Sequence, residues 1–323
     1  MADSGVPERS EAGVNMTVFP VLQRLSVVSA SVLLVACNSG SMEGQGSTAE
    51  QVAAISYMDQ TPPGQTPIQF APHIFVDELH ASLVFSADGD LVFWSEMGGD
   101  QVRVMERGAS GWSPAQNVPF ALPGGTSEPM LAPDGETLFF LSSEPIDGAR
   151  GEHVWRVRRT SDGWTVPEPL GPGVNNHPLH WSVSTSIPGT LYFGHAGGDR
   201  DIYRSEFRDG AFQDAVSVGQ GVNTRGHETT PFIAPDESYL LFSRSGAGSM
   251  ADLYVSFPDS SGNWQEAVSL GDAVNTVANH ELCPVVSPDG EYLFFIRNVD
   301  GDLKPHWVRS SVFLDLRPGG NDQ

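Results

Sequence analysis

The chain has 323 residues and a formal net charge of −23, with 40 acidic residues against 17 lysines and arginines. A field of this sign repels nucleic acid and anionic lipid surfaces, so the composition argues against either as a direct partner. The hydrophobic content of 39% is enough for one core, and the 35 glycines and 24 prolines are typical of a fold with many turns.

The first apolar stretch of the chain is short and ends in a cysteine. It follows Arg24 and finishes with Leu34-Val35-Ala36-Cys37, and it is too short and too poorly flanked for a transmembrane span. The pattern resembles the signal peptide and lipobox of a bacterial lipoprotein. We therefore predict a signal peptide over residues 1–36, with Met16 as an alternative start, and lipidation of Cys37. An ordinary secretory signal with an incidental cysteine is the alternative.

The segment after this cysteine has the composition of a tether. Residues 37–65 are rich in Gly, Ser, Thr, Gln and Pro and carry no sustained periodicity, which predicts a flexible linker. A repetitive region follows over residues 66–318, and residues 319–323 are predicted to be a disordered tail. With Cys37 lipidated, Cys283 has no disulfide partner and is expected to be a small buried group inside a strand.

The repetitive region carries one short pattern five times. Each copy has a turn of the Pro-Asp-Gly type followed by an apolar run that begins with a leucine. These leucines are Leu91, Leu138, Leu191, Leu240 and Leu293, so the repeat steps are 47, 53, 49 and 53 residues. A period of about 50 residues built from short β-rich segments predicts the blades of a β-propeller. The third copy departs from the pattern, because its turn reads Ile187-Pro188-Gly189 and lacks the aspartate.

The number of strands predicts how the ring closes. Each copy supplies an inner strand, then the leucine strand, then a third strand in which apolar and polar residues alternate. A fourth strand follows a Gly-aromatic turn such as Gly163-Trp164. Five sets of the first three strands are present, but only four fourth strands follow them. Residues 66–70 form a similar segment ahead of the first copy, and pairing it with the last set would remove two exposed edges. We therefore predict an all-β, five-bladed β-propeller closed by an N-terminal strand that joins the last blade. A six-bladed propeller is the alternative.

Several elements recur in fixed order, among them Ser287-Pro288-Asp289-Gly290, Asp252-Leu253-Tyr254 and Val274-Asn275-Thr276. Over residues 66–316 they resemble the TolB-like, WD40-like repeat (PD40 type) of bacterial envelope propellers. The resemblance implies ligand or protein binding more often than catalysis. It also implies a place in the cell envelope, lipid-anchored on the periplasmic or cell-surface side of the outer membrane, and the leaflet stays open.

A second recurring element predicts a site at one mouth of the axial channel. Three connections into inner strands carry a histidine at the same position, and the leucine strands of the last three blades end in His or Arg. In a propeller these connections open on the same face, so we expect the side chains to gather there. The candidate ligand-binding residues are His180, His195, Arg225, His227, Glu228, Arg244, His280, Glu281 and Arg297.

Three interpretations of this set are open. The repeated His-Glu pairs could bond neighbouring loops and close the ring, or imidazole and guanidinium groups could bind a carboxylate, phosphate or sugar. The third interpretation is metal-assisted catalysis with Glu228 or Glu281 as the base. Calcium or another divalent cation is an alternative ligand for the Asp-rich loops at residues 198–201 and 300–302, although neither has EF-hand spacing. The sequence contains no nucleophile elbow, Walker loop or His-Glu-x-x-His motif.

Together these features favour a monomeric, non-catalytic lipoprotein without a resident cofactor. Its propeller is expected to bind an envelope protein or a small anionic or carbohydrate ligand, and it contacts the membrane through the anchor alone. The alternative is a hydrolase or lyase that acts on a carbohydrate or other anionic substrate at the His/Arg/Glu mouth.

The anchor can be tested with one substitution. We expect Cys37→Ser to abolish membrane association, because no thiol remains for acylation. Fractionation of cells that express the wild-type and variant chains measures this, and a variant still found in the membrane fraction would contradict the lipidation.

Overall fold

The structure is a computed structural model that describes residues 55–197, 200–246 and 249–319. The chain divides into two units, Met1–Gln51 and Val52–Gln323, and the second unit holds the described residues. The predicted signal peptide, Cys37 and most of the predicted linker lie outside them, as does most of the predicted tail. Among the helices of the described ranges, none has the length and apolarity to cross a membrane.

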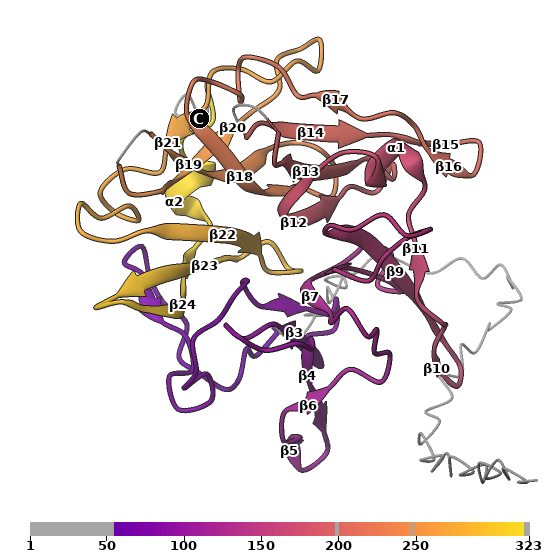
Figure 1. The fold of residues 1–323 in the computed structure, drawn as a ribbon. Helices are drawn as coiled ribbons and strands as arrows, with labels where there is room; N and C mark the ends of the chain where they lie inside the picture. Colours follow the sequence, from indigo (N-terminus) through magenta and orange to yellow (C-terminus); the bar gives the residue numbers. More distant parts are fainter. Residues whose placement is uncertain (1–54, 198–199, 247–248, 320–323) are drawn as a thin grey trace, which may run out of the picture. The chain divides into compact units, whose positions relative to one another are not determined.

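The strands form five antiparallel sheets around one axis, which are the blades of a propeller (Figure 1). The first blade contains β2 (Val84–Phe85), β3 (Leu91–Trp94), β4 (Arg103–Gly108), β5 (Gly111–Trp112) and β6 (Gln116–Asn117). The second contains β7 (Ser127–Leu131), β8 (Thr137–Ser142), β9 (His153–Thr160), β10 (Gly163–Trp164) and β11 (Glu168–Pro169). The third contains β12 (Leu179–Thr185), β13 (Leu191–His195), β14 (Ile202–Ser205) and β17 (Val216–Ser217), next to a separate hairpin of β15 (Phe207–Arg208) and β16 (Ala211–Phe212).

The remaining two blades complete the ring. The fourth contains β18 (His227–Ile233), β19 (Leu240–Ser245), β20 (Asp252–Ser256) and β21 (Val268–Ser269). The fifth contains β22 (Glu281–Val286), β23 (Tyr292–Val299), β24 (Asp302–Arg309) and β1 (Ile68–Gln69). Two short helices, α1 (Pro172–Asn175) and α2 (Ser311–Leu314), lie between or after blades. The prediction of a five-bladed, all-β propeller is confirmed, and the chain after β24 forms α2 rather than a strand of a sixth blade.

The N-terminal strand closes the ring as predicted. β1 pairs antiparallel with β24, with Ile68 opposite Trp307, and the backbone N–H of Phe70 donates to the carbonyl of Pro305 at 2.8 Å. The Phe70 side chain is fully buried, and its ring meets those of Trp307 and Phe294 edge-on, with centroids 5.0 and 5.1 Å apart. Edge-to-face aromatic pairs contribute about 1 kcal/mol each beyond the area they bury. Closure therefore combines backbone pairing with an aromatic core.

The Val-Asn-Thr element explains how each fourth strand turns into the next inner strand. Asn223 accepts from the backbone N–H of Ile202 at 2.9 Å and donates to its carbonyl at 2.8 Å, so its amide replaces a backbone partner. Asn275 makes the same two bonds to Leu253. The valines ahead of the two asparagines are fully buried. These asparagines bind the turn to the edge of the third strand of the preceding blade and so place the residues that follow.

The closing strand gives a direct stability prediction. We expect Phe70→Ala to lower the free energy of unfolding by about 3–5 kcal/mol, because it empties a packed aromatic site. Ile68→Ala is the matched control in the same strand, since Ile68 is 39% exposed. Urea unfolding followed by tryptophan fluorescence measures both. Equal, small effects of the two substitutions would show that the closing strand adds little to the fold.

Candidate functional site

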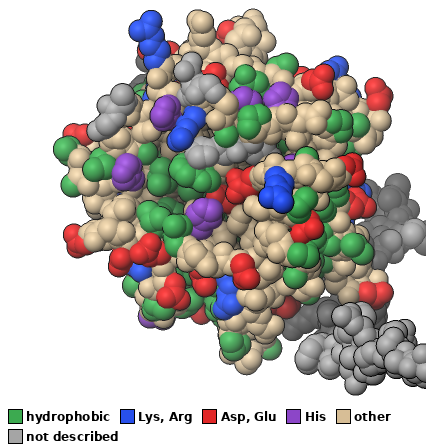
Figure 2. Space-filling view, in the orientation of Figure 1, with side chains coloured by type: hydrophobic (Ala, Val, Ile, Leu, Met, Phe, Trp, Pro, Cys, Tyr) green, Lys and Arg blue, Asp and Glu red, His purple; other side chains and the backbone are tan. Residues whose placement is uncertain are grey.

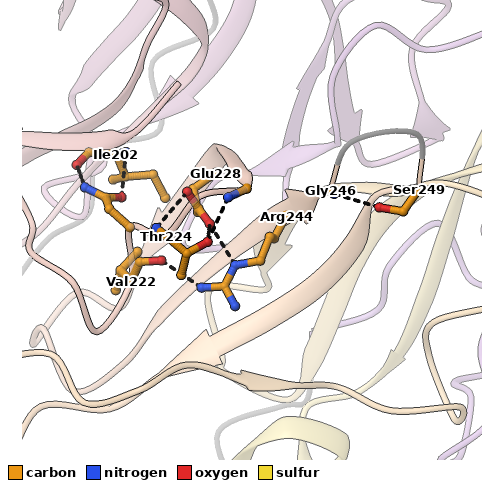
Figure 3. Close-up of polar contacts among 9 residues, drawn as sticks. Ile202, Val222, Thr224, Glu228, Arg244, Gly246 and Ser249 are labelled. Atoms are coloured by element: carbon orange, nitrogen blue, oxygen red, sulfur yellow. Dashed lines mark hydrogen bonds and ion pairs between the residues drawn. The ribbon is translucent and has the colours of Figure 1, made fainter. Parts of the chain in front are cut away.

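The predicted mouth contains two buried ion pairs. Glu228, at the start of β18, is fully buried and lies 2.8 Å from Nε of Arg244, which is in β19 (Figure 3). Its two oxygens also accept from the hydroxyl and backbone N–H of Thr224, at 2.6 and 3.2 Å. Nη2 of Arg244 donates to the carbonyl of Val222 at 2.7 Å, and the guanidinium lies over the ring of Tyr254. The pair thus holds the Val-Asn-Thr turn against the blade through Thr224 and Val222.

The same arrangement recurs in the fifth blade. Glu281 is fully buried, lies 2.9 Å from Nε of Arg297, and accepts from the hydroxyl of Thr276 at 2.9 Å. Nη2 of Arg297 donates to the carbonyl of Val274 at 2.6 Å. Burial raises the pKa of Glu281, while Thr276 and Arg297 act in the opposite direction. This repetition favours the interpretation that the Glu and Arg residues fix the turns of their own blades.

The predicted histidines contact different neighbours. Nδ1 of His280 accepts from the backbone N–H of Ala251 at 2.9 Å. His195 stacks on Tyr203 with centroids 4.5 Å apart, and its Nδ1 lies 3.2 Å from the backbone nitrogen of Gly197. Figure 2, which looks onto one face of the molecule, shows histidine side chains at separate places rather than around one point.

The other members of the set are exposed or lie outside the description. His227 and Arg225 are exposed, and the side chain of His180 is outside the described residues. Residues 198–199 of one Asp-rich loop are outside as well. Within the described ranges, no group of three or more His, Cys, Asp or Glu side chains is arranged to hold a metal ion. Ligand binding by these residues stays a prediction.

A constriction on the axis escaped the sequence analysis. The inner strands of the second to fifth blades each contain a register shift, at residues with positive φ: Glu128 (52°), Ser182 (46°), Thr230 (49°) and Cys283 (54°). A space of about 10 Å³ lies between these strands. The residues around it include Ser82 of the first blade, the bulge residues Ser182, Thr230 and Cys283, and the prolines Pro129, Pro231 and Pro284. That volume is at the lower limit for a single water molecule. The bulges therefore leave little space between the inner strands at this level.

Glu128 places a carboxylate at the level of the constriction. It is 2% exposed, and one oxygen accepts from the backbone N–H and hydroxyl of Ser182 at 2.9 and 2.6 Å. Its other oxygen lies 3.6 Å from Nδ1 of His80. Burial raises the pKa of Glu128 and also that of Glu152, and His80 lowers both. The sequence does distinguish Glu128, because the other repeats carry only Ser, Thr or Cys at the bulge position.

A larger recess opens on the opposite side of the constriction. Along β18 the order is Glu228 at the predicted mouth, Thr230 at the bulge, and Phe232 and Ile233 in the wall of this recess. Its volume is about 600 Å³, and all five blades line it. We call it the turn-face funnel, because the Pro-Asp-Gly-type turns form its rim. Its wall residues include Val84, Phe85, Met130, Leu131, Ile187, Phe232, Ile233, Val285 and Val286.

The rim turns are held by their own side chains. Both oxygens of Asp134 accept hydrogen bonds, from the backbone N–H groups of Glu136 and Thr137 and from the Thr137 hydroxyl, each at 2.8 Å. Burial raises the pKa of Asp134, but these hydrogen bonds outweigh burial and lower it overall. The aspartate of the repeat therefore stabilises the turn, and the apolar wall of the funnel is left for a ligand.

Comparison with known proteins gives the fold. No family model and no curated protein sequence matches the chain. Solved structures similar to it include a putative TolB from Agrobacterium tumefaciens, with a TM-score of 0.50, 16% identity, and coverage of 72% of this chain and 77% of that one. An endo-arabinase from Bacteroides thetaiotaomicron gives a TM-score of 0.51 at 13% identity, with coverage of 73% and 95%.

TolB from Acinetobacter baumannii is also similar, with a TM-score of 0.46 and 12% identity; the chain covers 54% of its length with 72% of its own. The neighbours of this chain thus include TolB-like propeller proteins. At these identities the likeness establishes the propeller architecture and leaves the activity open.

Glu128 gives a pH-dependent prediction. Its pKa is raised in the folded chain, so the folded state holds this proton more tightly than the unfolded state and loses stability as the pH rises above the ordinary pKa of a glutamate. We therefore expect Glu128→Gln to raise the melting temperature at pH 7 and to change it little at pH 4. Thermal unfolding across this range measures the effect. An equal shift at both pH values would mean that the carboxyl group does not titrate as described.

Proposed function

We propose that this protein is a non-catalytic envelope lipoprotein whose propeller binds an apolar ligand, or the apolar side chains of a partner, in the turn-face funnel. The observation that carries the proposal is the funnel itself. Its volume of about 600 Å³ is lined by all five blades. Concave, mostly apolar sites of this size are the usual form of small-molecule sites in proteins.

The chemistry of the two faces favours binding over catalysis. The ionisable side chains that line the funnel are Asp236, Asp289 and Tyr239. Asp289 accepts from the hydroxyl of Ser287 at 2.6 Å, and burial raises the pKa of Tyr239 above its ordinary value, which keeps the phenol neutral. At the other mouth, Glu228 and Glu281 are fully buried in ion pairs and unavailable as bases.

The apolar wall also bears on the kind of ligand. A sugar needs several hydrogen-bonding groups, whereas the funnel presents mainly aliphatic and aromatic side chains, so an apolar group fits it better. Exposed His227 and Arg225 at the opposite mouth keep an anionic ligand there as the second candidate. We further propose that the chain acts as a monomer and without nucleic acid, in line with its net charge of −23.

The proposed location follows from the leader sequence. A lipid on Cys37 and a tether over the residues that follow it would hold the propeller near a membrane without embedding it. The tether would end before Tyr57 and Met58, because both side chains are buried in the propeller core.

The site can be tested with a neutral apolar dye. We expect Nile red to bind the wild-type chain with enhanced fluorescence, and Val285→Asp and Ile187→Asp to weaken binding at least about fivefold, because a charge in the wall must be desolvated. Ile187 is 71% exposed at the rim, so its variant tests the site without disturbing the core.

Val277→Asp is the matched control, because Val277 is 98% exposed and lines a different cavity. Dye binding that is the same in all four chains would place the apolar site elsewhere and refute the assignment to the funnel.

A further inference from the structure

We propose that the ligand of the funnel is a small amphipathic carboxylate, and that Arg156 and Arg158 bind its carboxylate group in a notch beside the funnel. This inference rests on the proposed function, because it assumes that the apolar part of the ligand occupies the funnel. It adds a second, polar half to the site and names the chemical class of the ligand.

The notch lies between the second and third blades. Its volume is about 380 Å³, and it shares Ala132, Pro133, Thr185 and Ile187 with the funnel. The two spaces are therefore neighbours at the turn face and share part of one wall. Phe139, Phe207 and Phe212 line the notch further out, together with the two arginines. A ligand in the funnel would reach the notch across the rim turns at Pro133 and Ile187, which line both spaces.

A departure from the repeat accounts for the notch. In the first, second and fourth blades the Gly-aromatic turn carries tryptophan, and these rings pack on the preceding blade. The ring of Trp164 lies 6.1 Å from that of Phe93, and the ring of Trp264 lies 6.4 Å from that of Tyr192. The third blade has Phe212 instead, which contacts Phe139 with centroids 6.4 Å apart. The smaller ring leaves space at this interface.

The third blade departs from the repeat pattern at a second position beside the notch. Its turn at residues 187–189 lacks the aspartate that the other turns carry. Ile187, which stands in that turn, lines both the funnel and the notch and is 71% exposed. The boundary between the two spaces is thus apolar at this residue.

Both arginines line this space, and Arg158 is exposed beside Asp134, whose pKa it lowers. Arg156 and Arg158 are alternate residues of β9 and so lie on the same face of the strand. The Arg156 side chain is 23% exposed, and its Nε is buried without a hydrogen-bond partner among the described residues. Its ion pair with Glu168 is long, at 3.5 Å, and that carboxylate is 64% exposed. Asp134 also lines the notch, but its oxygens are occupied by its own turn.

Charge complementarity identifies the polar half of the ligand. A guanidinium group with free donors matches a carboxylate, which can accept two parallel hydrogen bonds from it. The chain as a whole carries a net charge of −23 and repels anions, so an anion is favoured where two arginines lie together. The volumes of about 600 and 380 Å³ suit a small molecule with an apolar body and one charged end.

The test compares two molecules that differ only in the charged group. Decanoate and decan-1-ol each compete with Nile red for the full chain carrying Cys37→Ser, which needs no detergent. We expect decanoate to displace the dye at least about tenfold more effectively than decan-1-ol. A hydrogen-bonded charge pair between the carboxylate and an arginine would provide this difference in affinity.

We expect Arg156→Gln and Arg158→Gln to remove this preference without changing the affinity for decan-1-ol. Phe212→Trp should remove it too, by filling the notch, and it keeps the proposal testable if an arginine variant does not fold. Arg208→Gln is the matched control, because Arg208 is 66% exposed near the notch but does not line it.

Each outcome separates the inference from the proposed function. Equal displacement by decanoate and decan-1-ol would overturn the carboxylate site and leave the apolar funnel standing. A preference that survives the Arg156, Arg158 and Phe212 substitutions would also overturn it. Failure of the dye and of both competitors to bind the funnel would refute the proposed function itself.

Discussion

The pairing of β1 with β24 is the constraint on which the rest of the structure depends. Without it, β24 of the fifth blade would present an open edge, and the segment that precedes the first blade would no longer be joined to the last one. No single blade forms the wall of the funnel, because each blade contributes only a few apolar residues to it. The funnel is thus a product of ring closure, and its shape follows from the number of blades.

The fold could be predicted because its information is local. Each turn, leucine strand and Gly-aromatic turn recurs within one blade, and counting the fourth strands was enough to assign residues 66–70 to the last blade. The roles of Glu228 and Arg244 were harder to predict from the sequence. Their positions at one mouth follow from the repeat, but the hydroxyl of Thr224 and the carbonyl of Val222 that engage them depend on side-chain conformations within the folded turn.

The funnel escaped prediction for a different reason. Phe232 and Ile233 stand in an apolar inner strand, and a sequence gives such residues the same pattern whether they face a neighbouring blade or a recess at the axis. The constriction was hidden likewise, because a bulge moves one residue of each inner strand out of alternation. Glu128 and Phe212 suggest a general approach: in a repeat protein, positions that break the repeat are the places to look for a site.

Amide hydrogen exchange at the closing strand tests the central claim most directly. The N–H of Phe70 donates to Pro305 in the fifth blade at 2.8 Å, so its exchange reports whether the ring is closed. A closed ring predicts that this amide exchanges as slowly as the amides between β22 and β23. Exchange of Phe70 at the rate of an unstructured peptide, with β22 and β23 still protected, would show an open ring and contradict the account.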